Sequence, residues 1–158
     1  MNIALLVVDM QKAFFDNASE ESMKNAVAYI NYSVELFREN HKKIIWIQDG
    51  NGTEGFEIID ELNPQQNEKQ IVKHYGNSFN KTELMDYLTE EKIDTIIITG
   101  YCAENCVLST YRGALDLDLT PVILKNGIAS ENKENVKFVE DISEMITIGL
   151  LEKIIQNL

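Results

Sequence analysis

The stretch from Ile3 to Val8 is apolar at every position. A strand with one face in water alternates apolar and polar residues, whereas a strand covered on both faces is an unbroken apolar run. Two further runs, at 43–48 and 94–99, are rich in β-branched residues, and helical patterns separate the three. This alternation predicts an α/β three-layer sandwich, with a mainly parallel, Rossmann-like sheet of five or six strands and helices on both faces.

The remaining segments extend this pattern. Apolar residues recur at helical spacing after residue 19, and short strands are expected at 70–72, 119–124 and 145–146. The segment 49–70 contains three glycines and a proline and is expected to be irregular. Side chains expected to cap the helices are Ser19, Asn80 together with Glu83, Ser130 and Thr147.

Composition restricts the possible partners. A length of 158 residues suits one domain, here 1–158, and the net charge of -12 argues against nucleic acid or an anionic membrane as a partner. The first apolar run is too short to span a bilayer. Two cysteines four positions apart do not form a disulfide framework. We therefore expect a cytoplasmic protein that acts on a small molecule.

Several polar residues follow predicted strands. Asp9, Asp49, the segment 100–106 and Asn126 each come at the carboxyl end of a strand. Ligands of parallel α/β sheets bind at that edge. We therefore expect these residues to share one rim of the sheet.

Cys106 lies where the run 94–99 passes into a helical pattern. Free N–H groups in a first helical turn should lower the pKa of a thiol and can receive an oxyanion. Asp9 can exchange a proton with the thiol, and Lys73 can supply a positive charge. Each also has a simpler interpretation: a buried apolar cysteine, a turn-forming aspartate and a solvated surface lysine.

Three motifs occur in order along most of the chain: Val7-Val8-Asp9-Met10-Gln11, Val72-Lys73-x5-Phe79 and Gly100-Tyr101-x4-Cys106-Val107. Together they resemble the isochorismatase-like cysteine hydrolase superfamily, which includes nicotinamidases and N-carbamoylsarcosine amidase-like enzymes. The resemblance implies a triad of Asp9, Lys73 and Cys106, and a thioester on Cys106. It implies a cis peptide before Cys102, with the backbone N–H groups of Cys102 and Cys106 as oxyanion hole. It also implies a homo-oligomer, a dimer or larger.

Other site residues are predicted with less sequence support. Aromatic and polar candidates for the substrate pocket are Phe14, Phe15, Trp46, Gln48, Tyr75, Phe79 and Tyr101. The nicotinamidase branch holds a metal with an aspartate and two histidines after its second strand. Here Asp49 is followed by no histidine before His74, which we place at the pocket edge or surface. We therefore predict no metal and no other cofactor.

Our leading hypothesis is a metal-independent amidase that cleaves a C–N bond of a small uncharged or cationic amide or carbamoyl compound. A second is a redox or thiol-sensing protein that uses Cys102 and Cys106. Nicotinamidase or isochorismatase activity proper, and a binding module without catalysis, remain further alternatives.

Overall fold

A computed structural model describes residues 1–16, 18–52 and 54–158 of the chain. Six parallel strands form one sheet in the order β3-β2-β1-β4-β5-β6. The strands are β1 (Ile3–Val8), β2 (Lys43–Asp49), β3 (Lys69–Lys73), β4 (Thr95–Tyr101), β5 (Thr120–Ala129) and β6 (Met145–Ile146). The helices are α1 (Glu20–Glu39), α2 (Leu84–Glu90), α3 (Leu108–Asp116), α4 (Lys133–Asp141) and α5 (Ile148–Ile155).

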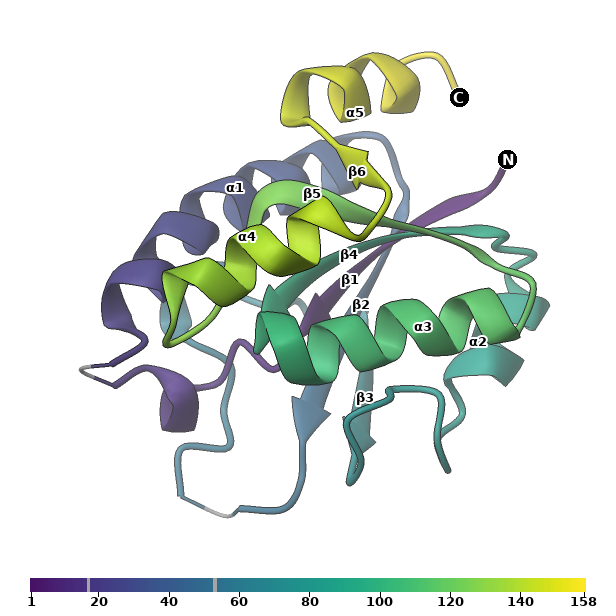
Figure 1. The fold of residues 1–158 in the computed structure, drawn as a ribbon. Helices are drawn as coiled ribbons and strands as arrows, with labels where there is room; N and C mark the ends of the chain where they lie inside the picture. The colour runs from purple at the N-terminus through teal and green to yellow at the C-terminus, as the bar shows by residue number, and fades with distance from the viewer. Residues whose placement is uncertain (17, 53) are drawn as a thin grey trace.

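Helices cover both faces of the sheet (Figure 1). Helices α1 and α5 pack against one apolar cluster, and α2, α3 and α4 pack against the other. Alternate residues of β1 enter the two clusters: Leu5 faces the first, and Leu6 faces the second. Burial on both faces explains why β1 is an unbroken apolar run, and the predicted sandwich is confirmed.

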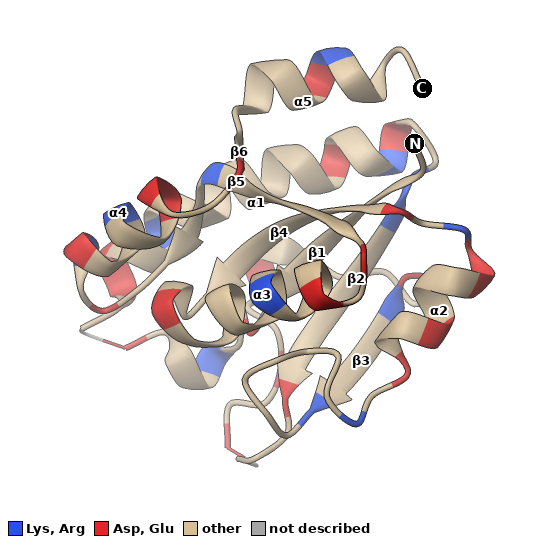
Figure 2. Cartoon of the chain, turned by 45° about the vertical axis from the view of Figure 1, so that its right-hand side comes forward, with Lys and Arg blue, Asp and Glu red and all other residues tan. Residues whose placement is uncertain are grey.

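Short turns complete the chain: 3₁₀ turns at Lys12–Phe14 and Asp60–Leu62, and a π-helical turn at Ala103–Val107 that leads into α3. Acidic residues occur on the outer helices α2, α3, α4 and α5 (Figure 2). The negative net charge is therefore distributed over solvated helix surfaces. None of the helices in the described ranges combines the length and apolar character that a bilayer crossing requires.

Strand β5 differs from the prediction. It was expected to end near residue 124, which would have placed Asn126 on the rim, but it continues to Ala129. Ile123 pairs with Ile98 and Ile128 pairs with Gly100, so the intervening residues form a bulge. Asn126 lies in this bulge with a φ of 65° and is exposed. The prediction for Asn126 is wrong because the chain rejoins the sheet after a turn-like sequence.

Only one of the predicted side-chain caps forms as expected. Thr147 accepts a hydrogen bond from the first turn of α5. The hydroxyl of Ser19 instead donates to the carbonyl of Phe14. The side chain of Glu83 does not cap α2, and the Leu84 N–H donates to the hydroxyl of Thr82. Asn132, rather than Ser130, caps α4. The serine at 130 lies buried near the turn after β4, where its hydroxyl has other partners.

Candidate active site

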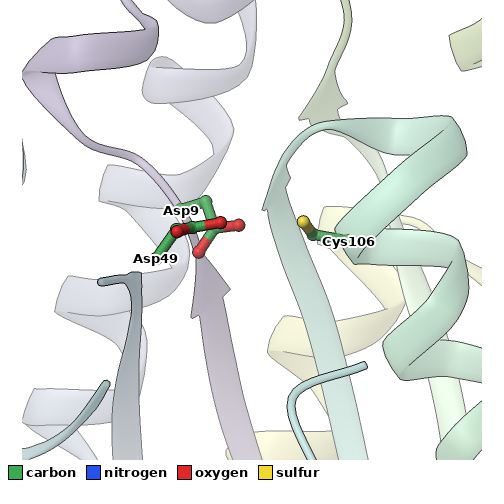
Figure 3. A group of neighbouring side chains, drawn as sticks. All are labelled: Asp9, Asp49 and Cys106. Carbon is green, nitrogen blue, oxygen red and sulfur yellow. The ribbon is translucent and has the colours of Figure 1, made fainter. Parts of the chain in front are cut away.

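Three strand ends bring the predicted triad together. Asp9 follows β1, Lys73 ends β3, and Cys106 lies in the π-helical turn after β4. Asp49 ends the intervening strand β2 and is paired in register with Lys73. Figure 3 shows the carboxylates of Asp9 and Asp49 beside each other, with the thiol of Cys106 facing them from the turn.

The ammonium of Lys73 is the centre of this group. Its Nζ lies 2.9 Å from Oδ2 of Asp9 and 3.3 Å from Sγ of Cys106. Oδ2 of Asp49 is 3.8 Å away. The side chain of Lys73 has 0% of its surface exposed and that of Asp9 has 2%. Lys73 is thus a buried cation and not a solvated surface amine.

Burial changes the protonation of the triad. It raises the pKa of Asp9, and the attraction of Lys73 only partly opposes this effect. Burial also raises the pKa of Cys106 to about 12, reinforced by the Asp9 carboxylate and opposed by Lys73. The expectation of a thiol pKa lowered by the helix start is therefore wrong. Burial and the neighbouring Asp9 carboxylate thus disfavour the thiolate form of Cys106.

The backbone around Cys106 has unusual geometry. Gly100 has a φ of 114°, and a Cβ atom there would lie 2.0 Å from the carbonyl oxygen of Val8. Only glycine therefore permits this approach of β4 to β1. The peptide bond between Tyr101 and Cys102 is cis, as the resemblance implied. Within the described residues, the N–H of Cys102 donates no backbone hydrogen bond.

A cavity of about 390 Å³ opens over the triad. Of the predicted pocket residues, Phe14 and Tyr101 line it, and their rings stack with centroids 5.3 Å apart. Sequence reasoning missed Glu104, Asn105 and Glu131, which also line the cavity. Glu104 and Asn105 lie in the same turn as Cys106, and this proximity in the sequence was the signal that could have identified them.

Comparison with known proteins identifies the family. Residues 3–143 match the model of the isochorismatase domain. The chain belongs to the isochorismatase family. The isochorismatase family protein YrdC of Bacillus subtilis is 31% identical over 137 residues, which cover 80% of this chain and 73% of the relative.

Solved structures of this family share the whole fold. An isochorismatase-like hydrolase from Alkaliphilus metalliredigens has a TM-score of 0.89 and 26% identity, over 97% of this chain and 98% of the other. An N-carbamoylsarcosine amidase from Thermoplasma acidophilum has a TM-score of 0.81 and 25% identity, over 93% and 95%. The protein is an isochorismatase-family hydrolase, and the predicted enzyme class is confirmed.

The other predicted pocket residues of this isochorismatase-family hydrolase lie outside the cavity. Phe15 and Phe79 pack against the two core clusters, and Tyr75 is 44% exposed. Gln48 is buried on β2 and donates to a backbone carbonyl in the segment between β2 and β3. The indole of Trp46 is fully buried. Aromatic character alone did not locate these side chains.

The acidic residues near Cys106 do not fit a metal site. Ligand atoms of Asp9, Asp49 and Cys106 lie within 4.8 Å of one another. The Lys73 ammonium lies within 3.8 Å of all three residues, so a divalent cation there would face an existing positive charge. Oδ1 of Asp49 also accepts two hydrogen bonds from Asn51, each of 2.8 Å.

His74 lies outside this group. Its side chain is exposed, and its Nδ1 lies 3.4 Å from Oδ1 of Asn51. Its position agrees with the surface placement predicted from the sequence.

Proposed function

We propose that this isochorismatase-family hydrolase cleaves the C–N bond of a small amide or carbamoyl compound, without a metal, through a thioester on Cys106. The observation that carries the proposal is the buried contact of one ammonium with both a carboxylate and a thiol. Lys73 Nζ lies 2.9 Å from Asp9 and 3.3 Å from Cys106. The N-carbamoylsarcosine amidase among the structural neighbours supports C–N chemistry on this fold.

In the first half-reaction, Cys106 Sγ attacks the substrate carbonyl as its proton moves to Asp9. Oδ1 of Asp9 is buried and has no hydrogen-bond partner among the described residues, so an acceptor is available there. The N–H groups of Cys102 and Cys106 stabilise the oxyanion. Asp9 then donates the proton to the leaving nitrogen, the C–N bond breaks, and ammonia or an amine departs.

In the second half-reaction, water attacks the thioester. Asp9 accepts a proton from the water, and the oxyanion forms again at the same N–H groups. Collapse of this intermediate breaks the C–S bond, and the proton returns to the Cys106 sulfur. The acid product then dissociates, and Cys106 is again a free thiol. Throughout both steps Lys73 retains its charge, which stabilises whichever of Asp9 and Cys106 is anionic.

The test is release of ammonia from a panel of small amides and carbamoyl compounds after chelator treatment. Wild-type protein is compared with Cys106→Ala and, as the test of the redox hypothesis, with Cys102→Ser, which retains the backbone N–H of residue 102. Release that survives the chelator and Cys102→Ser but disappears in Cys106→Ala supports the proposal. Release that requires added metal contradicts metal independence, and loss in Cys102→Ser with Cys102–Cys106 disulfide formation would favour the redox hypothesis.

A further inference from the structure

The cavity over Cys106 is negatively charged. Carboxylates of Asp9, Asp49, Glu104 and Glu131 line it, and the described residues of its lining include no lysine or arginine. The cation of the predicted triad, Lys73, has no exposed side-chain surface and pairs with Asp9 at 2.9 Å. Because one ammonium balances only one of four carboxylates, a molecule in the cavity experiences a net negative field.

Glu104 is held rigidly beside the nucleophile. Its Oε1 accepts hydrogen bonds of 3.1 Å from Ser130 and 2.8 Å from Asn135. Its Oε2 has no hydrogen-bond partner among the described residues and is shielded from water. Burial acts to raise the pKa of Glu104, but hydrogen bonds, including those from Ser130 and Asn135, outweigh burial and lower it. The turn thus holds a carboxylate of lowered pKa in the wall of the cavity.

Glu131 and an aromatic wall complete the cavity. Glu131 is exposed, and its Oε1 lies 3.4 Å from the hydroxyl of Tyr101. Tyr101 stacks on Phe14, so the carboxylate lies at the edge of an aromatic surface. Aromatic faces and carboxylates both attract ammonium groups.

We propose that the substrate is a small amide carrying a protonated nitrogen, which Glu104 and Glu131 bind while Cys106 attacks the carbonyl. This inference rests on the proposed amidase function of the cavity. Because Glu104 lies two residues from Cys106 in one turn, the ammonium and the amide carbonyl of the substrate lie only a few bonds apart. A carboxylate at the position of the ammonium would be repelled.

The kinetic test compares three amides of similar size and different charge: β-alaninamide (cationic), butyramide (neutral) and malonamate (anionic). We expect kcat/KM to fall at least about tenfold at each step in that order. Glu131→Gln and Glu104→Gln should each reduce the ratio of cationic to anionic kcat/KM, and the double variant should reduce it at least about tenfold.

Glu90→Gln, at the exposed end of α2, removes one charge away from the cavity and serves as matched control. Its ratio should equal that of wild type. Far-UV circular dichroism checks folding, and the exposed Glu131 gives a variant that does not disturb the turn. The inference would be overturned if the wild-type ratio of cationic to anionic kcat/KM were near one. It would also be overturned if the double variant had the same ratio as wild type.

A second measurement separates this inference from the proposed function. In Cys102→Ser protein, mass spectrometry follows the reaction of Cys106 with 2-aminoethyl and 2-sulfonatoethyl methanethiosulfonate. We expect the ratio of the cationic to the anionic reaction rate to be at least about tenfold higher for Cys106 than for free mercaptoethanol. The ratio should be smaller in Glu104→Gln and Glu131→Gln. Charge preference without hydrolysis of any amide refutes the amidase proposal alone. Hydrolysis without charge preference refutes the cationic substrate alone.

Discussion

Replacement of Lys73 by methionine tests the buried charges directly. Methionine fills a similar apolar volume but removes the ammonium 2.9 Å from Asp9. At that distance and an effective dielectric constant of about 20, the gross attraction is about 6 kcal/mol. Desolvation offsets part of this attraction. The relevant quantity is the cost of leaving a buried carboxylate unpaired, about 3–5 kcal/mol. Because Lys73 has 0% and Asp9 has 2% of the side chain exposed, water provides little screening.

The assay is urea unfolding followed by circular dichroism in a double-mutant cycle with Asp9→Asn. Asparagine suits the φ of 49° at position 9, so this variant removes charge without new backbone strain. Lys73→Met should lower the free energy of unfolding by about 3–5 kcal/mol. The double variant should lose less than the sum of the single variants, with a coupling of about 2 kcal/mol or more.

Lys69→Met provides the control on the same strand. Lys69 pairs with Glu83, but both side chains are partly exposed, at 30% and 54%. Its loss should cost less than about 1 kcal/mol. The reasoning fails if Lys73→Met is no more destabilising than Lys69→Met, or if the two changes at positions 9 and 73 are additive.

Other predictions follow from individual contacts. Because the pKa of Cys106 is raised to about 12, its alkylation by iodoacetamide at neutral pH should be slower than that of a free thiol and should still increase above about pH 10. Burial acts to raise the pKa of Glu68, but hydrogen bonds from Arg38, the Gln65 N–H and the Trp46 indole outweigh burial and lower it. Glu68→Gln should therefore cost about 2 kcal/mol at neutral pH in urea unfolding, and less as the pH falls through the folded-state pKa. Gly100→Ala should cost more than about 3 kcal/mol in the same assay, because the added Cβ overlaps the carbonyl of Val8; a midpoint near that of wild type would contradict this.

The fold could be predicted because a strand buried on both faces has a recognisable sequence pattern, a continuous apolar run. The runs at 3–8, 43–48 and 94–99 contain apolar residues on both sides of each strand, which only a covered parallel sheet requires. The extension of β5 beyond residue 124 has no such pattern. Lys125-Asn126-Gly127 has the composition of a turn. Pairing of Ile128 with Gly100 returns the chain to the sheet, and this long-range contact has no local signal.

The resemblance implied the triad, and two of its members could be placed at one rim because they occur at element boundaries. Asp9 follows β1, and Cys106 lies in the turn between β4 and α3, so topology alone places both at one rim. The cavity walls depend on side-chain packing between distant segments. Glu131 lies beside Tyr101 only because β5 passes the bulge and ends next to β4. Likewise, the helix-start argument for Cys106 included the local dipole but not burial or the Asp9 carboxylate, which dominate.

The raised pKa of Cys106 is compatible with catalysis because the proton need not reach water. With the thiol neutral, Asp9, Asp49 and Lys73 carry a net charge of about -1 in their ionised forms. Release of the thiol proton to solvent would add a second uncompensated negative charge to a buried group, which burial opposes. Transfer to Asp9 leaves the net charge unchanged, and the raised pKa of Asp9 makes it a better acceptor. The same burial that suppresses a free thiolate therefore favours transfer of its proton within the triad.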